Sequence, residues 1–372
     1  MRFAFCLFNY FPFGGLQRDF LQIANACHMR GHQVDVYTSA WQGERPPGVQ
    51  VSIVPARGFT NHRRCESFAK RLKHFLAQKS YDAVIGFNKM PGLDVYFASD
   101  TCFAAKALGK SFWYRLSGRY RSYLSLERSV FNKDSKTEIL LISEQEKAFL
   151  MDYYGTSEER FHLLPPGIAA DRLIPHNAHD IRSALRSELA IGPHQNVVLM
   201  VGSSFKTKGV DRAIRAVSSL PSELREKTTL LIVGKDNPRP FLRLAKRLGV
   251  LGQTRFFGGR EDVPRFLAAS DLLLHPAYEE TAGLVLMEAM GAGLPVLVTE
   301  VCGYSHHVES ADAGKLVPSP FRQQTLNQLL ASMLTSNKKD QWQRNGREYV
   351  ASTDVSSLPT KAADIIEQVA AW

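Results

Sequence analysis

Two glutamates, Glu280 and Glu288, stand eight residues apart in the stretch HPAYEETAGLVLMEAMGAGLPVLVT. A carboxylate among glycines and aliphatic residues can accept hydrogen bonds from sugar hydroxyls, or it can stabilise positive charge that develops on a sugar ring as its leaving group departs. Two glutamates at this spacing also occur by chance as solvated helix residues. The secondary structure around the two glutamates must therefore decide between a binding site and a solvated helix surface.

The apolar pattern around the pair predicts a strand, a loop, a helix and a second strand. Residues 271–276 predict a buried strand closed by proline, residues 283–290 repeat their apolar positions at helical spacing, and residues 294–299 predict another buried strand. Glu280 then lies in the loop before the helix, and Glu288 lies two turns along it. Open α/β sheets bind ligands at the carboxyl ends of their strands, where this loop is expected.

The amides of Ala282, Gly283 and Leu284 open that predicted helix. The first amides of a helix lack intrahelical partners, and together with the helix dipole they form an anion site. Gly283 allows a phosphate to approach the backbone closely. Because a carboxylate would repel a neighbouring diphosphate, we expect Glu280 to meet sugar hydroxyls and Glu288 to accept hydrogen bonds from ribose.

The order of elements along the 372 residues predicts an α/β protein with two Rossmann-like domains. Strand and helix patterns alternate, which favours parallel, doubly wound sheets. The pattern breaks at residues 165–167, Pro-Pro-Gly, and a second series then begins. We expect an N-terminal domain over residues 1–166, a C-terminal domain over residues 167–350, and a helix within residues 351–372 that packs back on the first domain.

The individual elements are predicted from runs of apolar residues. Strands are expected at residues 2–8, 33–38, 49–54, 83–87 and 138–143 in the first half, and at residues 197–201, 229–233, 255–257, 271–274 and 294–299 in the second. Helices are expected at stretches such as residues 17–29 and 66–78.

Each predicted domain opens with a glycine-containing loop after its first strand. Gly14 and Gly15 occupy this place in the first half, and the basic loop VGSSFKTKGVDR occupies it in the second. Neither loop matches a GxGxxG or Walker pattern, so dinucleotide binding and ATP hydrolysis are unsupported. Lys208 in the basic loop and Arg172, just past the Pro-Pro-Gly, could neutralise a diphosphate that leaves a sugar. A solvated surface charge is the commoner explanation for a single basic residue.

Composition limits the class of protein. Hydrophobic residues make up 44% of the chain, no stretch reaches membrane-spanning length, and the apolar residues 1–8 are too few for a secretory core. The five cysteines are scattered without a CxxC pair, which argues against a disulfide framework or a structural zinc site. We expect a protein of the reducing cytoplasm, without a cofactor and, since no Asp-x-Asp signature occurs, without a catalytic metal.

Six segments in one order resemble the retaining glycosyltransferases of family 4, which have the GT-B fold of two Rossmann-like domains. They are FPFGGLQRDF, RGHQVDVYT, LPPGI, VGSSFKTKGVDR, FFGGREDV and HPAYEETAGLVLMEAMGAGLPVL, and together they extend over nearly the whole chain. Glu280 and Glu288 match the E-x7-E motif of that family. The segments FCLFNYFPFGGLQRDF, GFNKMPGLDVYFASD and LLHPAYEETAG are similar, more closely, to bacterial lipopolysaccharide core glucosyltransferases that add the first hexose to heptose.

The resemblance implies an N-terminal acceptor domain and a C-terminal nucleotide-sugar domain, and it assigns the basic and glycine loops to the donor. Gly14 and Gly15 would face the diphosphate and the donor sugar, while Lys208 and Arg172 would bind the diphosphate. Thr207 stands where some relatives carry a further basic residue, so the charge contributed by that position is in doubt.

The resemblance also assigns the rest of the donor site. Arg260 and the backbone near Val263 would cradle the uracil. Glu280 would contact the sugar, residues 282–284 would hold phosphate and sugar through their amides, and Glu288 would bind ribose.

The implied reaction is transfer of a hexose from a UDP-sugar to a heptose of the lipopolysaccharide core, with retention and an α-1,3 linkage. UDP-glucose is the first candidate donor, and UDP-N-acetylgalactosamine or another UDP-N-acetylhexosamine is the alternative. Asp19 and Asp100 would approach the acceptor or the sugar hydroxyls, although Asp100 also fits an exposed aspartate at a strand end. A protein that binds a nucleotide or a glycan without catalysis is the alternative of another class.

The chain is basic, with a net charge of +10 and a pI of about 9.4. Residues 103–133 hold seven lysines and arginines against one glutamate, interleaved with aromatic residues. This pattern fits an anionic lipid surface. Nucleic acid would also attract such a basic segment. A structural helix with a solvated basic face would show the same pattern. Because the resembled enzymes act on a lipid-linked acceptor, we expect a monomer on the inner face of the inner membrane and no nucleic-acid partner.

Overall fold

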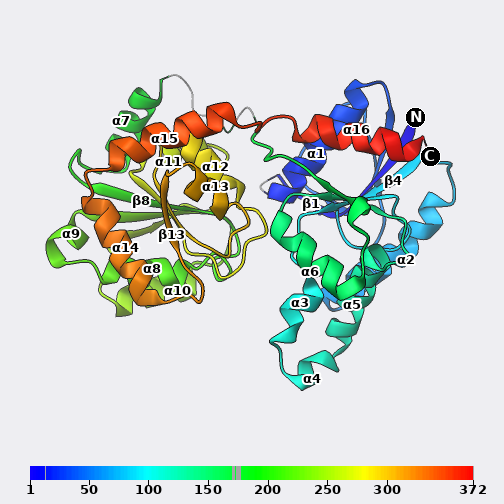
Figure 1. Ribbon diagram of the computed structural model, residues 1–372, viewed down its shortest axis with the longest axis horizontal. Coiled ribbons are helices and arrows are strands. Elements are labelled where there is room, and N and C mark those ends of the chain that lie inside the picture. The colour runs from blue at the N-terminus through cyan, green and yellow to red at the C-terminus, as the bar shows by residue number, and fades with distance from the viewer. Residues whose placement is uncertain (13, 170–171, 173–176, 372) are drawn as a thin grey trace. The chain divides into compact units, whose positions relative to one another are not determined.

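The computed structural model describes residues 1–371 except residues 13, 170–171 and 173–176. Residue 13 of the first glycine loop and residues 170–171 beside Arg172 therefore lie outside the described residues. The chain divides into two compact units (Figure 1). Unit 1 comprises Met1–Gly167 and Ser357–Trp372, and unit 2 comprises Ile168–Ser356.

Unit 1 contains a parallel sheet whose seven strands, within the described residues, lie in the order β3-β2-β1-β4-β5-β6-β7. The strands are β1 (Arg2–Tyr10), β2 (Gln33–Trp41), β3 (Gln50–Ile53), β4 (Ala83–Gly86), β5 (Val95–Ala98), β6 (Glu138–Leu141) and β7 (Phe161–Leu163). The helices are α1 (Gly15–Met29), α2 (Asn61–Leu76), α3 (Phe103–Leu108), α4 (Phe112–Arg115), α5 (Gly118–Phe131), α6 (Glu144–Tyr154), the 3₁₀ turn η1 (Glu158–Arg160) and α16 (Leu358–Ala370).

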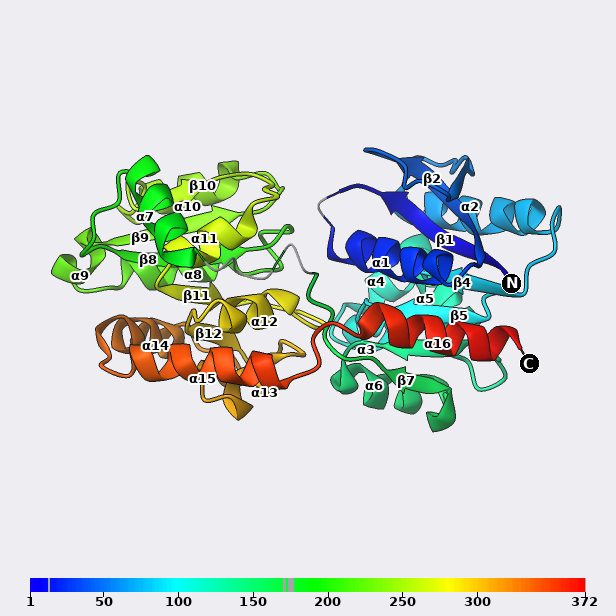
Figure 2. The same cartoon turned by 90° about the horizontal axis from the view of Figure 1, so that it is seen from above.

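Successive side chains of β1 contact helices on opposite faces of this sheet. Ala4 and Cys6 belong to a core cluster with residues of α2, α5 and α6. Phe5 points to the other face, where its ring lies 6.1 Å from that of Phe20 in α1. Successive side chains of a strand leave on opposite faces, and all of these are buried because helices cover both. Figure 2 shows α1 and α16 along one face of the unit.

The last helix, α16, belongs to unit 1 and lies beside α1 (Figure 1). Its Leu358 and Ile366 are buried. Arg30 pairs with Asp364 at 2.7 Å and with Glu367 at 3.0 Å. These partly exposed ion pairs contribute little compared with the apolar contacts, so hydrophobic burial is the main attachment of this helix.

Unit 2 contains a second parallel sheet, whose described strands lie in the order β10-β9-β8-β11-β12-β13. The strands are β8 (Asn196–Val201), β9 (Thr228–Val233), β10 (Thr254–Phe256), β11 (Leu272–His275), β12 (Val296–Thr299) and β13 (Gly314–Val317). The helices are α7 (Ala178–Glu188), α8 (Val210–Ser218), α9 (Ser222–Glu226), α10 (Arg239–Arg247), α11 (Val263–Ala269), α12 (Leu284–Gly291), α13 (Ser305–Ser310), α14 (Gln323–Thr335) and α15 (Lys339–Ser352).

The two parallel α/β sheets confirm the predicted fold class, and three details differ from the prediction. Strands β5, β7 and β13 were not predicted, and α2 begins at Asn61, five residues before its predicted start. The expected boundary at residue 350 falls inside α15, so residues 351–356 belong to unit 2. The helix continues there because Val350 is buried and its side chain lies close to Gly291 of α12.

Candidate active site

The loop between β11 and α12 carries the first of the two glutamates. β11 ends at His275, Pro276 follows, and α12 begins after Gly283, which has φ of +96°. A Cβ atom at Gly283 would be strained in this left-handed conformation and would lie 3.3 Å from Cγ of Glu280. Glycine is therefore required where the chain turns into the helix, and the first amides of α12, like those of any helix, lack intrahelical partners.

This loop is held by the segment that follows β12. Glu280 forms an isolated parallel bridge with Cys302. The amide of Gly303 donates to the carbonyl of Glu280 at 3.1 Å, and the amide of Tyr304 donates to the carbonyl of Ala282 at 2.8 Å. Residues 302–304 thus fix the backbone that presents the Glu280 carboxylate.

The Glu280 carboxylate contacts two groups from other parts of unit 2. The ammonium of Lys208 donates to its Oε2, and Nε2 of His275 lies 3.1 Å from the same atom. Burial alone would raise the pKa of Glu280, but the hydrogen bond with His275 and the charge of Lys208 lower it to about 2. Glu280 is therefore ionised at neutral pH, and it is only 15% exposed.

The basic loop before α8 packs directly against the loop that carries Glu280. The amide of Tyr278 donates to the carbonyl of Thr207 at 2.8 Å. Gly209 has φ of +74°, and a Cβ atom there would lie 2.1 Å from the carbonyl oxygen of Pro276. Only glycine permits this approach, which places Lys208 beside Glu280.

Arg212 joins the same two loops and was not identified from the sequence. Its guanidinium donates to the carbonyls of Pro276 and Ala277 at 3.1 and 2.9 Å. It also lies between the rings of Tyr278 and Phe321, at 3.5 and 3.6 Å from their centroids. A buried arginine that satisfies two carbonyls and two aromatic faces is a structural clamp. His275 was likewise missed, because it was interpreted only as the end of a strand.

The remaining predicted donor residues of unit 2 lie at three places. Glu288 is buried in the second turn of α12. Arg172 is buried, and its amide donates to the carbonyl of Ala169 at 2.8 Å. Arg260 is 39% exposed and forms a bidentate pair with Asp262 at 2.8 and 2.7 Å, next to Val263 at the start of α11. This pair raises the pKa of Arg260 and orients its guanidinium.

Two family models match the chain: glycosyltransferase family 4 over residues 13–172 and glycosyl transferases group 1 over residues 181–349. Lipopolysaccharide glucosyltransferase WaaG of Escherichia coli K12 is 48% identical over 365 residues, which are 98% of each chain. This chain is a glycosyltransferase of family 4. It is therefore an enzyme, and the alternative of a non-catalytic binding protein is wrong.

Solved structures give the same fold for this family 4 glycosyltransferase. The crystal structure of WaaG matches with a TM-score of 0.94 and 47% identity over 98% of this chain and 99% of that one. Sucrose-phosphate synthase of Thermosynechococcus elongatus matches with a TM-score of 0.82 and 19% identity over 100% and 99% of the two chains. The second of these shows the GT-B fold alone.

The predicted residues of the glycosyltransferase's first domain gather at the carboxyl end of β1, with one exception. Gly14 precedes α1 and Gly15 is its first residue. A Cβ atom at Gly14 would collide with Gln17, whereas one at Gly15 would meet nothing within 4 Å. Asp19 follows one turn later, where burial raises its pKa to about 7 against the opposing charge of Arg18. Asp100 lies elsewhere, exposed in the segment after β5.

Proposed function

We propose that this glycosyltransferase moves a hexose from a UDP-sugar, with UDP-glucose as the first candidate, to a heptose of the lipopolysaccharide core. The observation that carries the proposal is the 48% identity to WaaG, which extends over 98% of both chains and so includes both domains. The proposed linkage is α-1,3, and the proposed stereochemical outcome is retention.

The proposed chemistry needs no separate catalytic base. The bond from the sugar C1 to the diphosphate oxygen breaks while the acceptor oxygen bonds to C1 from the same face. The acceptor proton passes to the departing diphosphate oxygen. Lys208, Arg172 and the first amides of α12 would stabilise the charge that accumulates on the diphosphate. Glu280, ionised and held by His275, would stabilise the positive charge that develops on the sugar ring.

Other side chains of unit 2 would bind the nucleoside. Glu288 would accept hydrogen bonds from ribose, and Arg260 with the backbone at Val263 would hold the uracil. We propose that no metal takes part, since Lys208 and Arg172 supply positive charge where a cation would otherwise be needed. On the side of the acceptor, Asp19 and Asp100 would meet hydroxyl groups.

The test is a screen of UDP-sugars against truncated lipopolysaccharide that ends in heptose, with the product identified by mass. Addition of one glucose residue is expected. Addition of an N-acetylhexosamine would show that the donor is a UDP-N-acetylhexosamine and not UDP-glucose. The absence of transfer from every UDP-sugar would refute the proposed reaction.

We also propose that residues 103–133 attach the enzyme to the inner face of the inner membrane. Aromatic and aliphatic side chains are exposed around α4, with Phe112, Trp113 and Leu116 at 68%, 78% and 47% exposure. Basic residues flank them, including Lys110 and Arg119, for which the structure gives no carboxylate partner among the described residues. No helix in the described part of the chain is long and apolar enough to cross a membrane. A peripheral contact by aromatics and cations is the arrangement such a segment favours.

A further inference from the structure

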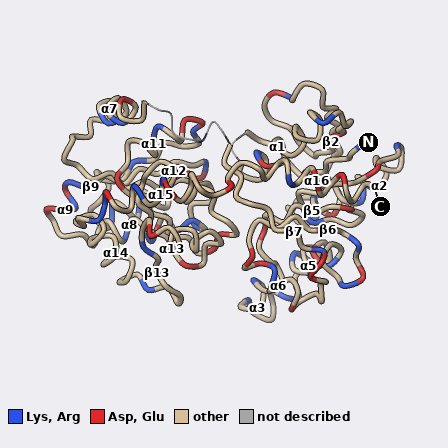
Figure 3. The backbone as a smooth tube through the Cα atoms, turned by 45° about the horizontal axis from the view of Figure 1, so that its top comes forward, with Lys and Arg blue, Asp and Glu red and all other residues tan. Residues whose placement is uncertain are grey.

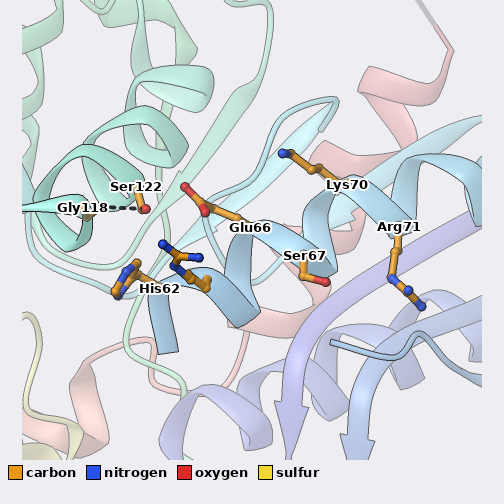
Figure 4. Close-up of a pocket in the computed structure, with 8 residues that line it drawn as sticks. His62, Glu66, Ser67, Lys70, Arg71, Gly118 and Ser122 are labelled. Atoms are coloured by element: carbon orange, nitrogen blue, oxygen red, sulfur yellow. Dashed lines mark hydrogen bonds between the residues drawn. The ribbon is translucent and has the colours of Figure 1, made fainter. Parts of the chain in front are cut away.

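A recess in unit 1 lies outside the site described above. It has a volume of about 450 Å³ and is lined by α2 and α5 (Figure 4). The lining residues are His62, Arg63, Glu66, Ser67, Lys70, Arg71, Gly118 and Ser122. Helices α2 and α5 pack against each other on one face of the sheet.

The cations of this recess lack carboxylate partners. Buried arginines elsewhere have partners: Arg186 pairs with Asp271, and Arg212 donates to the carbonyls of Pro276 and Ala277. The side chains of Arg63, Lys70 and Arg71 form no ion pair and no hydrogen bond with any described residue. Unpaired cations along the lining of a recess are suited to an anion supplied from outside the protein.

The recess also offers groups that suit a polyhydroxylated ligand. Ser67 accepts a hydrogen bond from the amide of Arg57 at 3.1 Å, so its own hydroxyl hydrogen can be donated. Ser122 donates to the carbonyl of Gly118 at 2.8 Å and can accept in return. Glu66, on α2, points toward Ser122 on α5 (Figure 4), and its carboxylate can accept from hydroxyl groups. Cations beside a carboxylate and two hydroxyls match an acidic saccharide better than a simple inorganic anion.

The position of the recess within unit 1 agrees with an acceptor role. α2 follows β3, so its first turn, with His62 and Arg63, lies toward the carboxyl edge of the parallel sheet, where α/β sheets bind ligands. α5, which comes after β5, α3 and α4, packs beside α2. α5 also continues directly from the exposed aromatics of α4, and Lys and Arg positions recur along α2 and α5 (blue in Figure 3). A lipid-linked saccharide held at the membrane by its lipid would present its acidic groups near that segment.

We infer that the recess between α2 and α5 binds an acidic group, carboxylate or phosphate, of the acceptor saccharide, an inference that rests on the proposed function. Arg63, Lys70 and Arg71 bind the anion, and Glu66 with the two serines binds neighbouring hydroxyls. The recess thereby selects acidic glycans as acceptors, while the donor site is unaffected.

The experiment compares two variants with the same change in composition. The first replaces Arg63, Lys70 and Arg71 with alanine, which favours helix and so preserves α2. The control replaces Arg243, Lys246 and Arg247, exposed residues of α10 in unit 2, with alanine. Steady-state transfer to delipidated, heptose-ending lipopolysaccharide is measured for both. The KM for the acceptor is expected to rise about tenfold or more in the first variant only, because charge-assisted hydrogen bonds are lost, with kcat and the KM for the UDP-sugar unchanged.

Modified acceptors identify the acidic group. Removal of phosphates with hydrofluoric acid, or reduction of carboxyl groups, is expected to raise the wild-type KM to that of the first variant in one of the two cases. Added inorganic phosphate is expected to compete with the acceptor in the wild type and not in the first variant.

Three outcomes would overturn the inference. These are an unchanged acceptor KM in the first variant, an equal rise in both variants, or a loss of binding to anionic phospholipid vesicles with no change in KM, which would assign the recess to a lipid headgroup. Wild-type enzyme that transfers no sugar to any heptose acceptor would refute the proposed function instead, so the two failures are distinguishable.

Discussion

Charged groups differ in burial between two regions of the molecule. These are the loop between β11 and α12 in unit 2 and the segment from α3 to α5 in unit 1. In the loop, Glu280 is largely buried and is held by Lys208 and His275. In the segment, Phe112 and Trp113 are mostly exposed, and the flanking cations face solvent. Groups that are already paired and oriented act on charge that develops during a reaction. Charged groups that are exposed to solvent act on a partner that arrives from outside, and their effect is sensitive to salt.

Substitution of Glu280 tests the preorganised side of this comparison and should have the largest effect. Glu280→Ala is expected to lower kcat for transfer by about 1000-fold, the upper range for loss of one electrostatic contact to a transition state. UDP binding, measured by calorimetry, should persist because Lys208 is retained. Glu280→Gln keeps the volume and removes the charge, so a similar loss would assign the effect to the charge. Turnover close to the wild-type value in Glu280→Ala would remove Glu280 from the mechanism, and the same result in Glu280→Gln alone would show that its charge is not needed.

Neutralising the segment tests the other side. Glutamine at Lys106, Lys110, Arg115, Arg119 and Arg121 together is expected to weaken binding to anionic vesicles about 100-fold or more, since each cation near such a surface contributes about 1 kcal/mol. Glutamine is chosen because Arg115 and Arg121 donate to the carbonyls of Leu108 and Leu116 at 2.6 and 2.8 Å, and its amide can still donate. Sedimentation with vesicles measures the change.

Salt and a second variant separate the two contributions to this binding. Ionic strength near 1 M, where the Debye length is about 3 Å, should reproduce the loss in the wild type. Substitution of Phe112, Trp113 and Leu116 with serine should remove the vesicle binding that persists at high ionic strength. Turnover on delipidated acceptor should stay unchanged in the glutamine variant. Equal losses on lipid-bound and delipidated acceptor would instead identify a structural helix with a solvated basic face.

His275 tests whether the pairing of Glu280 matters for its ionisation. His275→Phe keeps a ring but removes the hydrogen bond that lowers the pKa of Glu280, and is expected to reduce kcat about tenfold, as for a lost hydrogen bond to a charged group. The pKa of Glu280 should rise from about 2, so the acidic limb of the kcat profile should move to higher pH. His275→Asn retains a donor and should recover part of the rate. Superimposable pH profiles for His275→Phe and the wild type would show that His275 does not act through Glu280.

The same pKa shift links Glu280 to stability. Its pKa in the folded protein lies below the ordinary value of 4.5, so the ionised form stabilises the fold at pH above 4.5, and this contribution is lost as the pH falls toward 2. Urea unfolding at pH 6 and pH 3 should therefore show a smaller acid-induced loss of stability in Glu280→Gln than in the wild type. An equal loss in both proteins would mean that other groups determine the acid sensitivity.

Chelation should have the smallest effect. Excess EDTA is expected to leave transfer unchanged, because Lys208 and Arg172 are proposed to neutralise the diphosphate. Loss of activity with EDTA and its recovery with magnesium or manganese would require a different account of the leaving group.

Much of the fold could be predicted because buried parallel strands are continuous apolar runs. Val197–Val201 of β8 shows this clearly, and its prediction was confirmed. β13 was missed because its four residues, Gly314–Val317, include a glycine and a lysine. A Cβ atom at Gly314 would lie 1.9 Å from the carbonyl oxygen of Val296, so the neighbouring strand determines this residue. Strand propensity alone does not indicate such a contact.

The sequence by itself determined the family, the two sheets, the loop position of Glu280 and the glycine that turns the chain into α12. These features depend on residues close in the sequence, whose spacing and backbone preferences are local. The tertiary structure decided that His275 and Lys208 meet on one carboxylate oxygen, that Arg212 joins two loops through Tyr278, and that α2 and α5 form a basic recess. Each of these contacts joins residues of different elements or residues at the two ends of one folded loop. Distances between such groups are set by sheet order and helix packing, which no local pattern contains.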